Sequence, residues 1–80
     1  MLRMGAGSDR SPQDVLQAAV EFFGPGGAGL TVAQRSDDAV RFEGGGGHVV
    51  VQVRAKDGGA EVDIETREWE YQVRQFLAQI

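Results

Sequence analysis

Apolar and polar residues alternate in four segments between Leu30 and Thr66, and this pattern constrains the fold more than any other feature of the sequence. A period of two places successive side chains on opposite faces of a strand, so one face of the sheet is buried and the other meets solvent. The sequence therefore predicts four β-strands, with an amphipathic helical segment before them and another after them. The alternating segments are 30–32, 40–42, 49–53 and 62–64.

Short connections decide the direction of these strands. A parallel crossover takes about a dozen residues or more, so consecutive strands are expected to be antiparallel neighbours in a meander. A slip of one residue would turn the apolar side chains of a strand toward solvent, and this restricts the registers. In the last hairpin, a two-residue turn at 57–58 places Val53 opposite Val62. The same turn places Val51 opposite Ile64.

The other two hairpins follow the same rule. Closure around the glycine run 44–47 sets Phe42 opposite Val49 on the buried face. On the solvent face it sets Glu43 opposite His48. The first hairpin, through residues 36–38, pairs Val32 with Phe42.

Two helices are predicted to cover one face of this sheet. The first begins at Ser11, a capping residue followed by Pro12, and ends at about Phe23 before the run 24–27. The second follows the last strand directly, with Thr66 as its capping residue. Its apolar face consists of Trp69, Val73, Phe76, Leu77 and Ile80. The predicted fold class is α+β: a two-layer sandwich of helix, four-stranded antiparallel meander and helix.

Residues 11–80 form a single α-β4-α domain in this prediction, and residues 1–10 form a flexible N-terminal tail. The first ten residues are small or polar and show no periodicity, so little apolar area offsets the entropy of ordering them. A chain of 80 residues is near the lower limit for one unstapled core. The absence of cysteine excludes disulfides and thiolate metal ligands, and we expect no cofactor.

Charge and hydropathy narrow the expected partners and location. The formal net charge of −4 opposes attraction to nucleic acid and to anionic membranes, and the basic residues are dispersed along the chain. No apolar run approaches the ~18 residues needed to span a bilayer, and residues 1–5 lack the apolar segment of a secretion signal. We therefore expect a soluble cytoplasmic protein with no nucleic-acid or membrane partner.

The glycine run 44–47 is a first candidate for chemistry, since exposed backbone N–H groups can cradle an anion. A phosphate-binding loop leads into a helix and adds a lysine, whereas here the run leads into a strand. We expect a flexible hairpin tip, and the alternative is a loop that contacts a ligand.

His48 is the second candidate, because it is the only histidine. Its expected partner is Glu43, directly across the strand pair. The two residues form either an ordinary cross-strand pair or the dyad of a hydrolase-like site, for which the sequence supplies no nucleophile.

Glu61, Asp63 and Glu65 alternate on the solvent face of the last strand. Such a row can hold a divalent cation or act as an acid/base pair. The simpler interpretation is the charged face of an edge strand, paired with Arg54 and Arg41, which discourages accidental strand addition.

Tyr71 and Arg74 lie on the opposite side of the second helix from its apolar face, whereas Trp69 belongs to that face. Tyrosine and arginine are enriched at contact surfaces. This pair is therefore the predicted interface, and Trp69 is assigned to the core.

The predicted order of elements over residues 11–80 resembles, in topology alone, the helix-grip folds related to the birch-pollen allergen and the TATA-binding-protein-like domains. In these folds a long helix lies across a curved antiparallel sheet. The sequence is expected to lack the additional strand that they place before the first helix. The resemblance rests on no sequence motif, so it implies an architecture and assigns no functional residue.

The leading hypothesis is a small non-catalytic interaction module that self-associates, as a homodimer, because so small a two-layer domain benefits from further burial. The alternative, suggested by the helix-grip resemblance, is a binder of a small apolar ligand between sheet and helices. A hydrolase-like site using Glu43 and His48 is the third hypothesis. The predicted ligand-binding residues are Phe22, Phe23, Phe42, His48 and Trp69.

Overall fold

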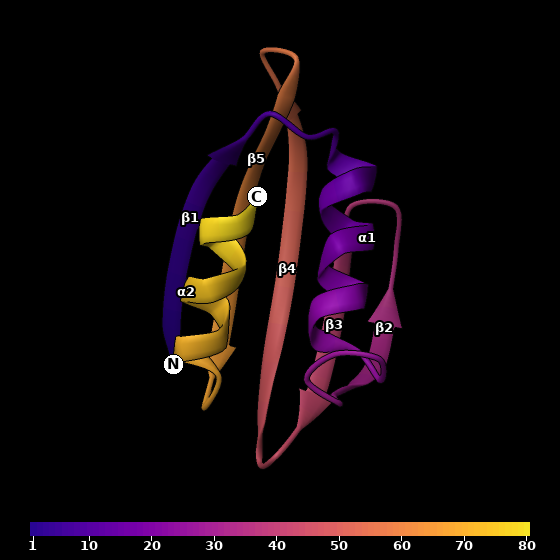
Figure 1. Cartoon of the computed structure of the whole chain (residues 1–80), viewed down its shortest axis with the longest axis vertical. Helices are drawn as coiled ribbons and strands as arrows, with labels where there is room; N and C mark the ends of the chain where they lie inside the picture. The colour runs from indigo at the N-terminus through magenta and orange to yellow at the C-terminus, as the bar shows by residue number, and fades with distance from the viewer.

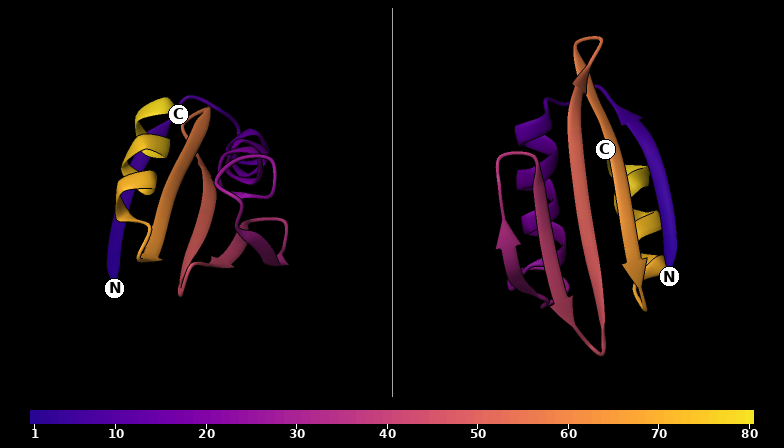
Figure 2. Two further views of the ribbon diagram at one scale, coloured as in Figure 1. Left: turned by 60° about the horizontal axis from the view of Figure 1, so that its bottom comes forward. Right: turned by 180° about the vertical axis from the view of Figure 1, so that it is seen from behind.

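The computed structural model describes all 80 residues and contains one five-stranded antiparallel sheet and two helices (Figure 1). The strand order in the sheet is β1-β5-β4-β3-β2. Both helices lie in front of the sheet in Figure 1 and behind it in the reverse view of Figure 2, so they cover the same face. The elements are β1 (Leu2–Ser8), α1 (Pro12–Phe23), β2 (Thr31–Arg35), β3 (Ala39–Gly44), β4 (Gly47–Lys56), β5 (Gly59–Arg67) and α2 (Glu70–Gln79).

Strand β1 corrects the expectation of a flexible tail over residues 1–10 and of a four-stranded sheet. It pairs with β5 along its whole length, from Leu2 opposite Thr66 to Ser8 opposite Ala60. Its burial alternates between half-buried and exposed, and Met4 packs against the core. The alternation of Leu2, Met4 and Ala6 with Arg3, Gly5 and Gly7 is a period-two pattern of small and apolar residues, and its partner β5 lies far away in the sequence. A strand before the first helix, which the sequence was expected to lack, is therefore present.

The strand registers agree with those predicted from the alternation. Val53 lies opposite Val62 and Val51 opposite Ile64. Likewise, Phe42 lies opposite Val49 in one hairpin and opposite Val32 in the other. Both central residues of the turns at 45–46 and 57–58 have positive φ angles. Type I′ turns require this backbone conformation, which matches the twist of the strands.

The core lies between the sheet and the helices. Three fully buried rings join its layers: Phe23 of α1, Phe42 of β3 and Phe76 of α2. The ring centroids of Phe23 and Phe42 are 5.5 Å apart, and those of Phe23 and Phe76 are 5.3 Å apart, both within the range of favourable aromatic pairs. The 15 buried core residues are Val15, Leu16, Ala19, Phe23, Leu30, Val40, Phe42, Val49, Val51, Val53, Ala60, Val62, Ile64, Val73 and Phe76.

The two helices begin in different ways. Helix α1 has the predicted cap, because the Ser11 side chain accepts a hydrogen bond from the Asp14 amide at 3.2 Å and Pro12 follows it. For α2, the predicted cap at Thr66 is wrong: Thr66 is buried within β5, where its hydroxyl donates to the His48 carbonyl oxygen at 2.9 Å. Glu68, at φ 75°, then turns the chain into the helix. Neither helix has the length and apolar character needed to cross a membrane.

The glycine run 44–47 is only partly a turn. Gly44 ends β3 and Gly47 begins β4, which leaves two residues for the turn itself. A Cβ atom on Gly47 would lie 2.1 Å from the Arg67 carbonyl oxygen. The indole of Trp69 packs beside Gly45 and donates to the Gly44 carbonyl oxygen at 3.0 Å. The run therefore makes room for the end of β5 and the start of α2 to approach the hairpin.

Candidate functional site

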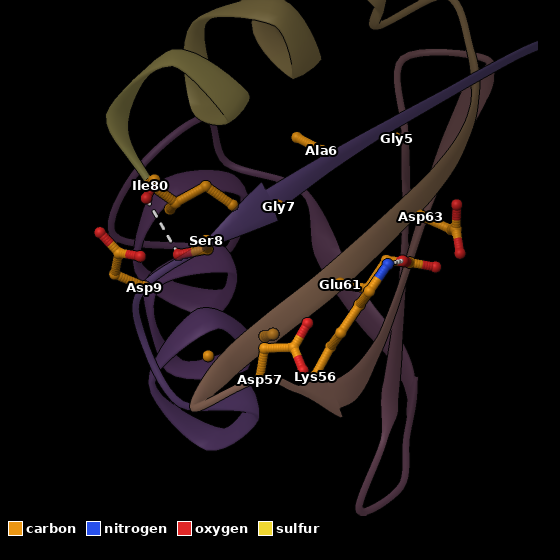
Figure 3. A pocket seen from close by; sticks show the side chains of 12 residues that line it. Gly5, Ala6, Gly7, Ser8, Asp9, Lys56, Asp57, Glu61, Asp63 and Ile80 are labelled. Carbon is orange, nitrogen blue, oxygen red and sulfur yellow. Dashed lines mark hydrogen bonds and ion pairs between the residues drawn. The ribbon is translucent and has the colours of Figure 1, made fainter.

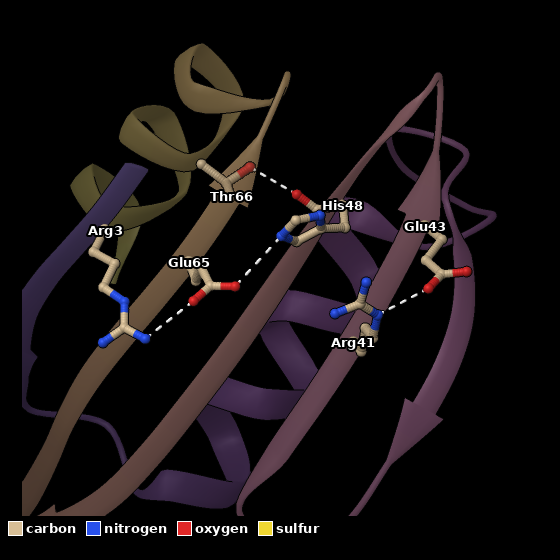
Figure 4. Close-up of polar contacts among 6 residues, drawn as sticks. All are labelled: Arg3, Arg41, Glu43, His48, Glu65 and Thr66. Atoms are coloured by element: carbon tan, nitrogen blue, oxygen red, sulfur yellow. Dashed lines mark hydrogen bonds and ion pairs between the residues drawn. The ribbon is translucent and has the colours of Figure 1, made fainter. Parts of the chain in front are cut away.

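The sheet face opposite the helices is uncovered, and charged side chains of neighbouring strands pair across it (Figure 4). Glu65 of β5 lies at the centre of one such group. Its carboxylate accepts from Arg3 Nη2 at 3.1 Å and lies 3.5 Å from His48 Nε2. The His48 side chain is only 13% exposed, and its Nε2 atom has no hydrogen-bond partner. These contacts connect β1, β5 and β4 on the open face.

The expected contact between Glu43 and His48 does not form, although the two residues lie opposite each other in the predicted register. The Glu43 carboxylate instead accepts from Arg41 Nε at 2.8 Å (Figure 4). Arg41 lies two residues earlier on the same face of β3 and carries a permanent charge, so it is the stronger local partner. The structure thus gives Glu43 and His48 separate partners.

The row of Glu61, Asp63 and Glu65 lies in the interior of the sheet, because β1 pairs with the outer side of β5. The interpretation of this row as an edge-strand face is therefore wrong. Glu61 pairs with Arg54, as predicted, and also with Lys56. Arg41, the other predicted partner of the row, pairs with Glu43 instead. Asp63 has no ion pair. No group of three acidic or histidine side chains in the chain is arranged to hold a metal ion.

Hydrogen bonds from Lys56 and Arg54 lower the pKa of Glu61 below its ordinary value of 4.5. A carboxylate with a lowered pKa in the folded state contributes stability above its unfolded pKa, and this contribution is lost as the pH falls through the folded pKa. We therefore expect Glu61→Gln to make stability less dependent on pH between neutral pH and acid. The effect is small because the site is exposed and screened by salt.

Urea denaturation at a series of pH values, at low and high salt, measures this dependence. Asp63→Asn is the matched control, since it removes a carboxylate from the same strand face without breaking an ion pair. An unchanged acid dependence in Glu61→Gln at low salt would contradict the role given to the Lys56 and Arg54 contacts.

A groove of about 620 Å³ lies along β1 and β5 near the turn that joins β4 to β5 (Figure 3). Two of its lining residues, Gly5 and Gly7 of β1, have no side chains, and a Cβ atom on Gly7 would meet nothing within 4 Å. The carboxylates of Glu61 and Asp63 also line it. We call this feature the glycine groove. It offers a side-chain-free surface next to two carboxylates, of which Glu61 is paired with Lys56, another residue of the lining.

The predicted ligand-binding residues do not share one site. Phe23 and Phe42 are fully buried in the core, and His48 lies on the open face of the sheet. The rings of Phe22 and Phe23 pack 4.9 Å apart, and of the five residues Phe22 and Trp69 line one surface groove, of about 490 Å³, between the end of α1 and the start of α2. Trp69 is therefore half-buried at the rim of the core.

Tyr71 and Arg74 are exposed on α2, and the Tyr71 side chain is among the most exposed large apolar groups, at 69%. Its hydroxyl accepts from Gln75 Nε2 at 3.3 Å. The structure leaves both side chains free to contact a partner.

Comparisons with protein-family models, with curated proteins and with solved structures found no significant match to this chain. Fold and surface together define its class: an α+β domain of two layers, with one sheet face and both sheet edges uncovered.

Proposed function

We propose that this protein is a non-catalytic interaction module that acts by self-association as a homodimer. The supporting observation is the incomplete covering of its apolar cluster. Removal of apolar area from water stabilises by about 25 cal/mol per Å², so a contact that covers some of these side chains favours association. The partly buried side chains packed against the core are Met4, Ala18, Val20, Phe22, Val32, Trp69, Leu77 and Ile80.

The hydroxyl groups favour a non-catalytic role. A serine nucleophile needs an adjacent base that is held in place by a third group. The Ser8 hydroxyl donates to the Ile80 carbonyl oxygen at 2.9 Å, Ser11 caps α1, and Ser36 bonds Asp38 at 3.0 Å. None of these contacts involves His48, and the three serines have structural partners.

An apolar ligand between the sheet and the helices has less support, because the rings of Phe23 and Phe42 occupy that space themselves. The groove at Phe22 and Trp69 lies at the surface, and Gln72 and Gln75 form part of its lining. A ligand site for an apolar molecule is usually enclosed and mostly apolar. Self-association is therefore the better supported function.

Sedimentation velocity and light scattering across the micromolar range test this proposal. We expect the mass to rise with concentration from 8.6 kDa toward twice that value. The apparent melting temperature is expected to rise with protein concentration, since association stabilises the folded state. A mass of one chain at every concentration would contradict the proposed function.

A further inference from the structure

We infer that the self-association surface is the free edge of β1, which pairs antiparallel with β1 of a second copy about a twofold axis at Gly5. This inference rests on the proposed self-association and names the surface that carries it. The two sheets would then join into one, with all four helices on the same face.

The two edges of the sheet differ in their protection against such pairing. Strand β2 is short, its register with β3 shifts between Val32 and Gln34, and four of its five residues are exposed. Short length and irregular register are two usual devices that block an edge. Charge does not separate the two strands, since each carries one arginine. Strand β1 has seven residues in uninterrupted register with β5, no proline, and Arg3 as its one charged residue. Thus β1 is the edge that accepts another strand.

The burial pattern of β1 restricts the register. Leu2, Met4, Ala6 and Ser8 are half-buried, whereas Arg3 and the glycines are exposed on the open face. Residues directly opposite in an antiparallel pair share a face, so an exposed residue must oppose an exposed residue. A twofold axis at Gly5 meets this condition and pairs all seven residues. It places Arg3 opposite Gly7 of the second copy and Met4 opposite Ala6.

Charge complementarity supports this register. The Arg3 side chain is 84% exposed, and in the pairing it lies beside the glycine groove of the second copy. Within each chain, Gly7 lies opposite Glu61 and Gly5 opposite Asp63. The Arg3 guanidinium, which pairs with Glu65 of its own chain, therefore extends over a floor without side chains toward Asp63 of the second copy, because Glu61 beside it is already paired with Arg54 and Lys56. Asp63, which has no ion pair within its own chain, gains a cationic neighbour.

The pairing also accounts for Gly7, which the single chain does not explain. Its φ angle is not positive, and a Cβ atom there would meet nothing. Glycine within a strand weakens it, and often marks the close approach of another backbone or of a ligand. In the twofold pair, a side chain at this position would stand in the path of Arg3 from the second copy.

An apolar strip borders the same edge on the helix side of the sheet. Met4 and Leu77 pack against the core but stay partly exposed. Gln72 and Gln79 line grooves between α2 and α1, so they mark the side of α2 that faces α1. An α-helix turns by about 100° per residue, which places Leu77 on the opposite side of α2. Leu77 therefore faces the β1 edge. The second copy would cover both side chains.

Replacing Gly7 with arginine tests the inference. A Cβ atom at this exposed position meets nothing within 4 Å in the single chain, so we expect the fold to be preserved. In the pair it stands opposite Arg3 of the second copy, twice per dimer, and like charges directly opposite destabilise strand pairing. We expect the dissociation constant to rise about tenfold. Circular dichroism and melting at low concentration verify that the variant is folded.

Three further variants complete the experiment. Gly26→Arg, the same change in open space on the loop after α1, is expected to associate like the wild type. Gly7→Gln, a long side chain without charge, is expected to weaken association less than Gly7→Arg. Arg3→Gln combined with Gly7→Arg removes the opposing charge and is expected to recover part of the affinity that Gly7→Arg loses.

The outcomes separate the two proposals. If the wild type dimerises and Gly7→Arg associates as tightly as Gly26→Arg, the β1 edge is not the surface, while self-association stands. If arginine and glutamine at position 7 weaken the dimer equally, the register at Gly5 is wrong. A wild type that stays monomeric overturns both the proposed function and this surface.

Discussion

Replacing Phe42 with alanine is expected to lower the free energy of unfolding by about 3–5 kcal/mol. Phe42 is fully buried, and its ring packs 5.5 Å from that of Phe23, which in turn contacts Phe76. Removal of this ring leaves a cavity where the sheet meets both helices. A chain of 80 residues has a total stability of about 4–12 kcal/mol, so the variant would lose much of it.

Urea denaturation measured by the fluorescence of Trp69, the only tryptophan, reports this loss. Tyr71→Ala is the matched control, because it removes an aromatic ring that is 69% exposed. We expect the control to change the free energy of unfolding by less than about 0.5 kcal/mol, as surface substitutions usually do. A Phe42→Ala variant that is as stable as this control would contradict the packing of the aromatic core.

The substitution Gly47→Ala is expected to destabilise the protein by about 1–3 kcal/mol, the usual cost of forcing extra volume into a packed site. Its Cβ atom would lie 2.1 Å from the Arg67 carbonyl oxygen and 2.8 Å from the Glu68 Cβ atom. Because the nearest atom belongs to the backbone, no side-chain rotation relieves the clash. Either β4 or the end of β5 has to move.

This movement has a local signature as well as a cost in stability. The Trp69 indole donates to the Gly44 carbonyl oxygen in the same hairpin, so its near-ultraviolet circular dichroism is expected to weaken in Gly47→Ala. Gly26→Ala, whose Cβ atom meets nothing within 4 Å, is the control. Equal melting temperatures for the two variants would show that the close approach at Gly47 does not restrict the residue there.

Tyr71 and Arg74 remain the interface predicted from the sequence, since nothing in the fold covers them. They differ from the β1 edge in what they offer a partner. An exposed helix face provides side-chain contacts alone, whereas a free strand provides an unsatisfied row of backbone donors and acceptors in addition. This difference is the physical reason for placing the twofold contact at β1.

Most side-chain contacts on the open face of the sheet could not be predicted from the sequence. The register that sets Glu43 opposite His48 follows from the alternation, but their carboxylate and imidazole groups have other partners. Side chains on an open face choose among several neighbours at similar distances. Glu65 acquires Arg3 as a partner only because β1 lies beside β5, and the alternation of Leu2, Met4 and Ala6 with exposed residues is the local sign of that strand, which the expectation of a flexible tail left out.

The sequence by itself determined the meander of β2 to β5 and its registers, because period-two alternation and two-residue turns act between neighbours in the chain. Only the tertiary structure decided the place of β1, the late start of α2 and the purpose of the glycines at 44–47. Each of these depends on backbone that approaches from a distant part of the chain. Such contacts are difficult to predict from local periodicity, since a strand of small residues is held by its pairing partner more than by its own side chains.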